Sequence, residues 1–162
     1  MLKIGIITAS DKGSAGERED LSQAVIREEV SDLGEVAAYA VVPDETGLLQ
    51  AKLIEFADEL QVNLIFTTGG TGFAPRDVTP EATMAVIDRF VPGIGEVMRL
   101  QSLKFTPHAM LTRGIAGIRK STLIINLPGS PKAVKECLGA IKPALSHGMA
   151  ILLGQASECA RK

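Results

Sequence analysis

Short apolar runs alternate along the chain with longer segments in which apolar residues recur every three or four positions. The runs are typical of buried strands and comprise residues 2–7, 36–42 and 62–66. The periodic segments are typical of amphipathic helices and comprise residues 21–33, 48–60, 79–90 and a stretch that begins after Pro92. Because strand, helix and strand follow one another in turn, the pattern predicts parallel strands joined by helical crossovers.

The rest of the chain departs from this alternation. Residues 113–118 and 122–127 are joined by the short connection Arg119-Lys120-Ser121, which predicts a hairpin with an antiparallel strand. Pro128-Gly129-Ser130-Pro131 then ends the last strand and begins a helix, which Pro143 should kink or end. Together these elements predict an α/β fold, a three-layer sandwich with a mostly parallel sheet flanked by helices.

Composition agrees with a single domain that spans residues 1–162. Its hydrophobic share of 46% can fill one core, and a net charge of −2 with no basic stripe argues against binding to nucleic acid. No long apolar run and no cleavable apolar leader is present, so we expect a cytoplasmic protein with no membrane partner. Cys137 is expected in the core and Cys159 in the tail, and His108 and His147 have no cysteine cluster beside them that would suggest zinc.

The most informative segment is Thr67-Thr68-Gly69-Gly70-Thr71-Gly72, which directly follows a predicted strand. Glycines lack the Cβ that would hold a ligand away, so their N–H groups can surround a phosphate, and the next helix adds its positive dipole end. We expect Thr79 to cap that helix and Pro80 to occupy its first position. The loop carries no Walker lysine, and a short glycine-rich turn is also compatible with an ordinary tight connection.

Three other polar loops follow predicted strands and should reach the same edge of the sheet. They are Thr8-Ala9-Ser10-Asp11, Pro43-Asp44-Glu45 and Pro128-Gly129-Ser130. Each has a local alternative. Ser10-Asp11 also suits a simple turn, and Ser130 suits the cap of the last helix. Asp44, with Thr46, also suits the cap of a helix that begins near Gly47.

Asp77 differs from these residues, because the expected cap at Thr79 leaves it no structural role other than a surface pairing with Arg76. If the fold brings Asp77 and Asp44 together, the two carboxylates would repel a nucleotide's phosphates unless a cation intervened. An all-oxygen site completed by phosphate is what Mg²⁺ prefers. We therefore predict a magnesium-assisted reaction in which the metal neutralises a leaving pyrophosphate. No Ser/His/Asp or Cys/His arrangement indicates a covalent intermediate.

The same residues match a known family. Residues 67–83, which contain the glycine-rich segment and Arg76-Asp77-Val78-Thr79-Pro80-Glu81, closely resemble the signature of the MogA-type molybdopterin-binding proteins, the molybdopterin adenylyltransferases. The likeness extends over the whole chain, because further motifs of the family are matched in order by residues 6–12, 42–45, 92–99 and 127–131. One departure is Gln23, which stands where the family usually places a glycine after Ser22.

The resemblance implies a MogA-like molybdopterin-binding fold and a homotrimer that transfers AMP from Mg·ATP to the terminal phosphate of molybdopterin and releases pyrophosphate. Asp44 and Asp77 would be the essential acidic pair that organises Mg²⁺ and the phosphates. The residues implied to contact phosphate or pterin groups, or to form the rim of the site, are Ser10, Asp11, Gly69, Gly70, Thr71, Gly72, Thr79, Gly129 and Ser130. ATP would be the co-substrate, and a molybdenum-insertion protein would receive the product.

Two other functions are compatible with the same fold. A binding module would hold molybdopterin and hand it on without turnover. A hydrolase of nucleotide pyrophosphates, as in the related competence-damage-inducible proteins, would act on a dinucleotide with no pterin present. The presence of both Asp44 and Asp77, together with Arg76 and Thr79, favours adenylyl transfer.

Overall fold

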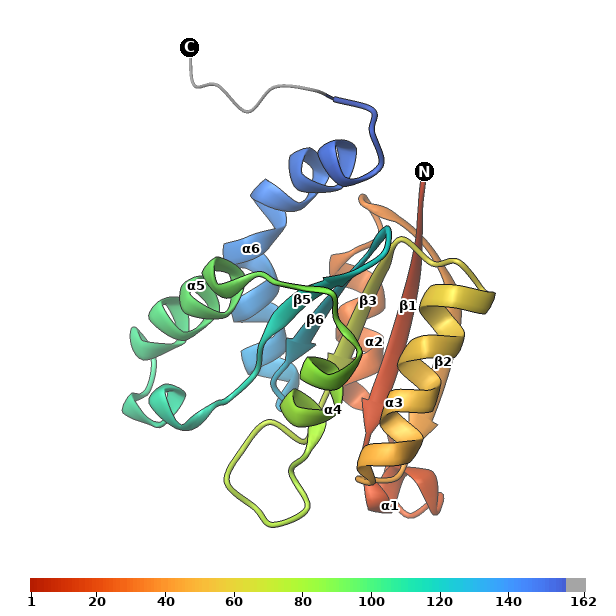
Figure 1. Cartoon of the computed structure of the whole chain (residues 1–162). Helices are drawn as coiled ribbons and strands as arrows, with labels where there is room; N and C mark the ends of the chain where they lie inside the picture. The colour runs from red at the N-terminus through yellow and green to blue at the C-terminus, as the bar shows by residue number, and fades with distance from the viewer. Residues whose placement is uncertain (157–162) are drawn as a thin grey trace.

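A six-stranded sheet with strand order β2-β1-β3-β6-β5-β4 runs through the centre of the computed structural model, which describes residues 1–156 (Figure 1). The strands are β1 (Leu2–Ala9), β2 (Gly34–Val42), β3 (Leu64–Thr68), β4 (Arg89–Phe90), β5 (Ala116–Arg119) and β6 (Thr122–Leu127). The strands β2, β1, β3 and β6 are parallel, whereas β5 runs antiparallel to β6 and to β4. The predicted α/β fold with a mostly parallel sheet is confirmed.

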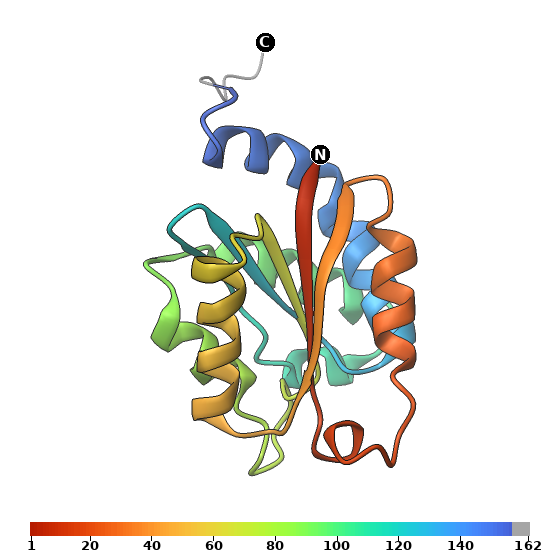
Figure 2. The same cartoon turned by 90° about the vertical axis from the view of Figure 1, so that its right-hand side faces the viewer.

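Helices cover both faces of this sheet (Figure 2). The helices are α1 (Asp11–Ser14), α2 (Leu21–Glu29), α3 (Thr46–Ile54), α4 (Thr79–Val86), α5 (Pro92–Leu103) and α6 (Pro131–Leu152). A π-helical turn (Glu55–Glu59) extends α3, and a 3₁₀ helix (Pro107–Leu111) follows α5. α3 and α4 pack on one face, and α2, α5 and α6 pack on the other. Within the described residues, no helix has both the length and the apolar character needed to cross a membrane.

The core is divided between the two faces by the alternation of side chains along the strands. Neighbouring residues of a strand point to opposite sides of a sheet. Phe66 therefore packs in one cluster with Ile125 and with Leu138 of α6, while Ile65 packs in the other with Leu53 of α3, and all five are fully buried. Burial of each such side chain stabilises the fold by about 1.5–3 kcal/mol. This double-sided burial explains why the strands appear in the sequence as continuous apolar runs.

The two cysteines lie in different parts of the chain. Cys137 is a buried core residue of α6 that faces Ser102 of α5, as predicted, and burial raises the pKa of its thiol. Cys159 lies outside the described residues.

Several predicted boundaries were wrong by a few residues. The helix predicted over 21–33 ends at Glu29, since the chain must already pair with β1 at Gly34, where an added Cβ would lie 2.2 Å from the Leu2 carbonyl oxygen. The helix predicted over 79–90 ends at Val86, and the last residues of that segment form β4. The third strand lies at 64–68 rather than 62–66, so it carries the first two threonines of the glycine-rich segment.

Two further features refine the sequence prediction. Pro143 lies inside α6 and does not end it, and the ribbon of this helix bends along its length (Figure 2). The polar patch 11–20, predicted as a loop, contains the helical turn α1, which begins because the Ser10 hydroxyl accepts a hydrogen bond of 2.9 Å from the Gly13 N–H. The parallel strands all end at the lower edge of the sheet in Figure 1, beside α1 and the glycine-rich loop.

Candidate functional site

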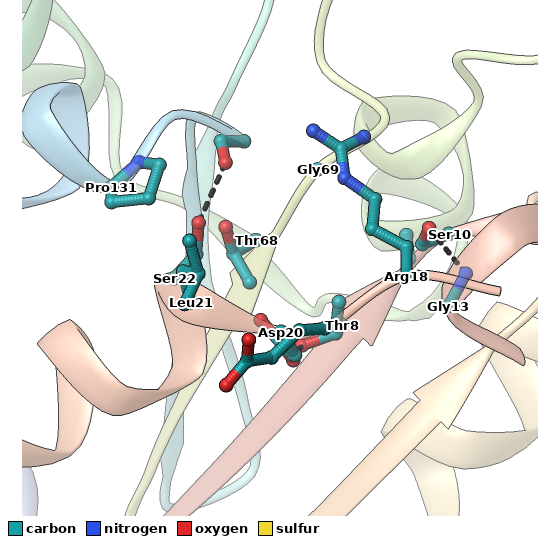
Figure 3. A pocket seen from close by; sticks show the side chains of 13 residues that line it. Thr8, Ser10, Gly13, Arg18, Asp20, Leu21, Ser22, Thr68, Gly69 and Pro131 are labelled. Carbon is teal, nitrogen blue, oxygen red and sulfur yellow. Dashed lines mark hydrogen bonds between the residues drawn. The ribbon is translucent and has the colours of Figure 1, made fainter. Parts of the chain in front are cut away.

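A cavity of about 150 Å³ opens at the carboxyl edge of the sheet (Figure 3). It lies between the ends of β1 and β3, the start of α2 and the loop that precedes α6. Its lining residues are Thr8, Ala9, Ser10, Gly13, Arg18, Glu19, Asp20, Leu21, Ser22, Thr68, Gly69, Gly129 and Pro131. Three of the loops that the sequence predicted to converge therefore do meet around one cavity.

Asp20 is held in place in the wall of this cavity by three hydrogen bonds. Its carboxylate accepts hydrogen bonds from the Thr8 hydroxyl, the Tyr39 hydroxyl and the Gln23 N–H, the last of which makes Asp20 the cap of α2. Burial and the hydrogen bond to Asp20 raise the pKa of Tyr39 to about 12, so the phenol stays a donor. The sequence prediction missed Asp20 and the exposed Arg18 beside it, although an acid directly before a helical segment is a cap signal.

Two buried hydroxyl groups in the wall of the cavity hold the loop that precedes α6. The Ser22 hydroxyl donates to the Gly129 carbonyl at 2.6 Å, and the Thr68 hydroxyl donates to the Pro128 carbonyl at 2.7 Å. Gly129 then lies so near the glycine-rich loop that an added Cβ would be 3.5 Å from the Gly69 Cα. Ser130 caps α6 by accepting the Ala133 N–H, which is the structural alternative considered for it.

The glycine-rich loop adopts a backbone that its glycines make possible. Gly69 and Gly70 have φ of +88° and +68°, in the left-handed region that residues with a Cβ adopt at a cost. A Cβ at Gly69 would lie 2.4 Å from the Ala9 carbonyl oxygen, and one at Gly70 would lie 2.3 Å from the Thr79 Oγ1. The loop is therefore shaped both by backbone conformation and by close neighbours.

Thr79 supports this loop and does not cap α4 as predicted. The residue before α4 is Val78, which makes no side-chain capping bond, and Thr79 is the first residue of the helix. Its fully buried hydroxyl donates to the Gly69 carbonyl at 3.0 Å, while its N–H donates to the Gly70 carbonyl at 3.1 Å. Thr79 thus holds two consecutive glycines in place.

The structure brings Asp44 and Asp77 to the same loop. A Cβ at Gly70 would lie 3.2 Å from an Asp44 carboxylate oxygen, and one at Gly72 would lie 2.8 Å from an Asp77 carboxylate oxygen. The charge of Asp77 is among the causes that raise the pKa of Asp44, after burial. Both carboxylates therefore lie beside the glycine-rich loop and close enough for the charge of one to act on the other.

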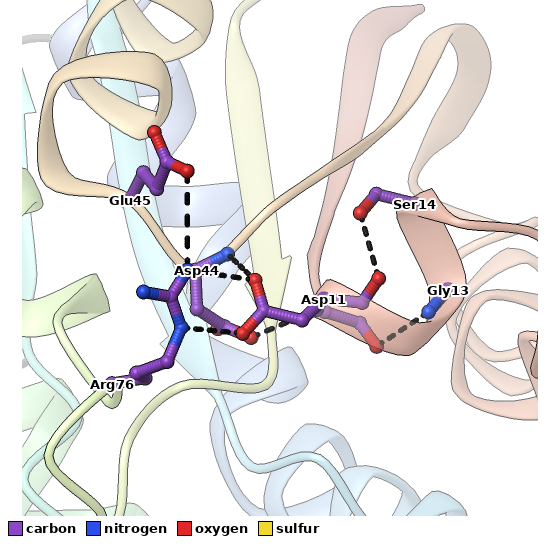
Figure 4. A network of polar contacts seen from close by, with 7 residues as sticks. Asp11, Gly13, Ser14, Asp44, Glu45 and Arg76 are labelled. Atoms are coloured by element: carbon purple, nitrogen blue, oxygen red, sulfur yellow. Dashed lines mark hydrogen bonds and ion pairs between the residues drawn. The ribbon is translucent and has the colours of Figure 1, made fainter.

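Asp44 is held by Asp11 rather than by the helix that follows it (Figure 4). The Asp11 N–H donates to the Asp44 carboxylate, and the Asp44 N–H donates to the Asp11 carboxylate, each at 3.0 Å. The predicted alternative, in which Asp44 caps α3, is wrong, because Glu45 occupies the capping position and makes no side-chain capping bond.

Arg76 completes this cluster. Its Nε and Nη2 both donate to the Asp11 carboxylate, which lowers the pKa of that carboxyl, and its guanidinium also approaches Glu45. The predicted alternative of an Arg76–Asp77 pairing is therefore wrong. Asp77 instead accepts the Ala74 N–H at 3.0 Å. Asp11 thus supports Asp44 and links it to the segment that carries Asp77.

We expect Asp44→Asn to be at least as stable as the wild type at pH 7. Burial raises the pKa of Asp44, so the folded protein binds this proton more readily than the unfolded chain does. The contribution of this proton to the free energy of unfolding is fully present below the ordinary pKa of an aspartate, and it is lost as the pH rises through the raised pKa of Asp44. The uncharged amide avoids this loss, so thermal unfolding at a series of pH values should show a melting temperature for the variant at or above that of the wild type at pH 7, with the difference shrinking in acid.

Asp58→Asn is a control in which the expected change in stability has the opposite sign. Hydrogen bonds from Arg119 and Lys120 lower the pKa of Asp58 to about 2, so its contribution to stability is present above the ordinary pKa and is lost only as the pH falls through the lowered value. This variant should be less stable than the wild type at pH 7. If Asp44→Asn were destabilised to the same extent, the hydrogen bond from Asp11 would outweigh the burial of the charge.

Asp44 and Asp77 fit a Mg²⁺ site in which the substrate and water supply the remaining ligands. Among the described residues, no group of three or more His, Cys, Asp or Glu side chains is arranged to hold a metal, so the protein alone offers no complete cage. Mg²⁺ typically uses one or two carboxylates together with substrate phosphates and water. Asp44 and Asp77 beside a glycine-rich loop match that requirement.

Comparison with known proteins identifies the family. Residues 5–147 match the family described as probable molybdopterin binding domain. The chain belongs to this family. Its sequence is 48% identical to the molybdopterin adenylyltransferase of Helicobacter pylori (strain J99) over 156 residues, which cover 94% of this chain and 89% of that protein. Identity to the molybdopterin adenylyltransferase of Escherichia coli (strain K12) is 44% over 146 residues, with coverage of 88% and 75%.

Solved structures support the same assignment. The molybdopterin biosynthesis enzyme MoaB of Thermus thermophilus superposes with a TM-score of 0.91 at 50% identity, covering 98% of this chain and 100% of that one. The predicted membership of the molybdopterin-binding family and the predicted MogA-like fold are both confirmed. The glycine-rich loop, Asp44 and Asp77 all lie within residues 5–147, the part of the chain that matches this family.

Proposed function

We propose that this protein is a molybdopterin adenylyltransferase of molybdenum cofactor biosynthesis, which transfers AMP from Mg·ATP to the terminal phosphate of molybdopterin. The observation that carries the proposal is the placement of Asp44 and Asp77 against one glycine-rich loop. Curated relatives 44–48% identical to this chain bear the name of that activity. The catalytic and metal-binding roles of the two aspartates are part of the proposal.

The residues of the chain have separable roles in this reaction. The N–H groups of residues 69–72 bind phosphate oxygens, and the N-terminus of α6 at Gly129 and Ser130 adds a positive dipole end. Asp44 and Asp77 would hold Mg²⁺, which would supply positive charge to offset that of the pyrophosphate. Ser10 and Asp11 form the rim, where Asp11 also orients Asp44. Thr71 and Thr79 complete the loop.

The chemical step needs no strong base. A terminal phosphate oxygen of molybdopterin attacks the α-phosphorus of ATP, a new P–O bond forms, and the bond to the bridging oxygen breaks so that pyrophosphate leaves with the electron pair. The attacking oxygen is already anionic at neutral pH. The protein therefore contributes by positioning the two anions and by stabilising the charge that develops between them.

Release of pyrophosphate from Mg·ATP tests the proposal. The purified protein should release pyrophosphate only when molybdopterin is present. Tight binding of molybdopterin without release would instead support a carrier or assembly role. Hydrolysis of a dinucleotide without any pterin would support a nucleotide pyrophosphatase.

We also propose a cytoplasmic homotrimer that passes its product to a molybdenum-insertion protein. The support for self-association is a set of exposed apolar side chains on α5 and the segment that follows it: Val97, Leu100, Leu103, Phe105, Met110 and Leu111. Exposed apolar surface of this kind is typical of protein interfaces. Sedimentation equilibrium, which measures the mass of the assembly in solution, distinguishes a trimer from a monomer.

A further inference from the structure

Arg113 makes four hydrogen bonds to the segment that carries the glycine-rich loop and Asp77. It lies in the connection between the 3₁₀ helix and β5, 36 residues from Asp77. Its backbone N–H donates to the Thr71 carbonyl, its Nε donates to the Gly72 carbonyl at 2.8 Å and its Nη2 donates to the Asp77 carbonyl at 2.7 Å. Its Nη1 donates to the Glu81 carboxylate in the first turn of α4.

These bonds fix both ends of one short loop. The Gly72 and Asp77 carbonyls bracket the segment that separates the glycines from the acid, and a single planar guanidinium binds both. Within that segment, the Asp77 carboxylate accepts the Ala74 N–H, and the Asp77 N–H donates to the Ala74 carbonyl. The direction of the Asp77 carboxylate is therefore tied to a backbone that Arg113 holds.

The contacts of Arg113 point to positioning rather than to phosphate binding. Its positive charge is paired with Glu81, so the guanidinium is not presented as a lone cation. Its side chain is one-third exposed, and all its hydrogen bonds fall on residues 71–81. We propose that Arg113 is a positioning residue that sets the place of the Asp77 carboxylate relative to the glycine-rich loop. This inference rests on the proposed function, in which Asp77 takes part in adenylyl transfer.

Arg119 provides a matched control elsewhere in the molecule. It also binds a carboxylate and a backbone carbonyl, through two bonds to Asp58 and one of 2.8 Å to the Val86 carbonyl. It pairs with Thr122 at the amino end of β6, so it lies at the edge of the sheet opposite to the site. Its removal should cost stability without disturbing the position of Asp77.

The experiment compares Arg113→Ala, Arg113→Lys and Arg119→Ala by steady-state pyrophosphate release and by thermal unfolding. Arg113→Ala should lower kcat on the order of 10- to 100-fold while the KM for Mg·ATP changes less than about 3-fold, because a misplaced acid affects the chemical step more than binding. Arg113→Lys should restore only part of kcat, since one ammonium cannot reach both carbonyls in the same geometry. Arg119→Ala should keep the wild-type kcat, even though its melting temperature should fall by as much as that of Arg113→Ala or by more.

Amide hydrogen exchange supplies a readout that does not depend on activity. Exchange across residues 72–78 should become on the order of 10-fold faster in Arg113→Ala and stay unchanged in Arg119→Ala, because only the first variant loses bonds to this loop. Unchanged exchange in Arg113→Ala would overturn the inference. A raised KM with an intact kcat, or an equal loss of kcat in both alanine variants, would also overturn it. Wild-type protein without pyrophosphate release would refute the proposed function alone, and the exchange comparison would still decide the role of Arg113.

Discussion

Replacing Asp77 with asparagine should remove nearly all adenylyl transfer while leaving the protein folded. The substitution removes the charge that faces the glycine-rich loop but keeps an oxygen that can accept the Ala74 N–H. Loss of one preorganised electrostatic group typically lowers kcat on the order of 10²- to 10³-fold. Molybdopterin-dependent pyrophosphate release should show this loss, whereas binding of molybdopterin should persist and the melting temperature should stay within about 4 °C of the wild type.

Asp88→Asn is the matched control for this charge removal. Asp88 is exposed, and its carboxylate accepts one backbone N–H, that of Lys120, at 2.7 Å. It lies near the β5–β6 turn, away from the carboxyl ends of the parallel strands. This variant should retain activity. A large loss of melting temperature in Asp77→Asn alone would instead assign Asp77 a structural role through its bond to Ala74.

The parts of the fold that the sequence predicted are those encoded locally. The apolar runs predicted strands because side chains such as Ile65 and Phe66 are buried on opposite faces, so polar residues are excluded from both positions. The convergence of the loops that carry Asp44 and Asp77 was predictable for a related reason. Both loops follow parallel strands, and the carboxyl ends of parallel strands lie at the same edge of a sheet. The approach of the two acids to each other was a condition that the sequence left open.

Contacts between distant parts of the chain could not be predicted in this way. Arg76 and Asp77 are adjacent in sequence, yet Arg76 binds Asp11, 65 residues away. Thr79 was expected to cap a helix, but the Gly69 carbonyl lies close enough to accept its hydroxyl. Arg113 gave no sequence signal at all, because its role depends on where a separate loop lies after folding.

Replacing Gly70 with valine should weaken the binding of both nucleotide and molybdopterin by at least about 10-fold. The residue has a φ of +68°, which costs a side chain with a Cβ roughly 1–2 kcal/mol. The new Cβ would also lie 2.3 Å from the Thr79 Oγ1 and 3.2 Å from an Asp44 carboxylate oxygen. The loop must therefore move away from the hydroxyl that holds it, and the N–H groups that bind phosphate move with it. Equilibrium titration with each ligand measures the loss.

Gly154→Val is a control that has the backbone strain of a positive φ but leaves the glycine-rich loop unchanged. Gly154 has a similar φ of +71°, but among the described residues no atom beyond its chain neighbours lies within 4 Å of an added Cβ there. This variant should lose stability and keep its affinity for both ligands. Gly70→Val should lose stability and affinity together, because its new side chain collides with Thr79 and Asp44 in the loop itself. Unchanged affinity for both ligands in Gly70→Val would refute the assignment of residues 69–72 as the phosphate-binding loop.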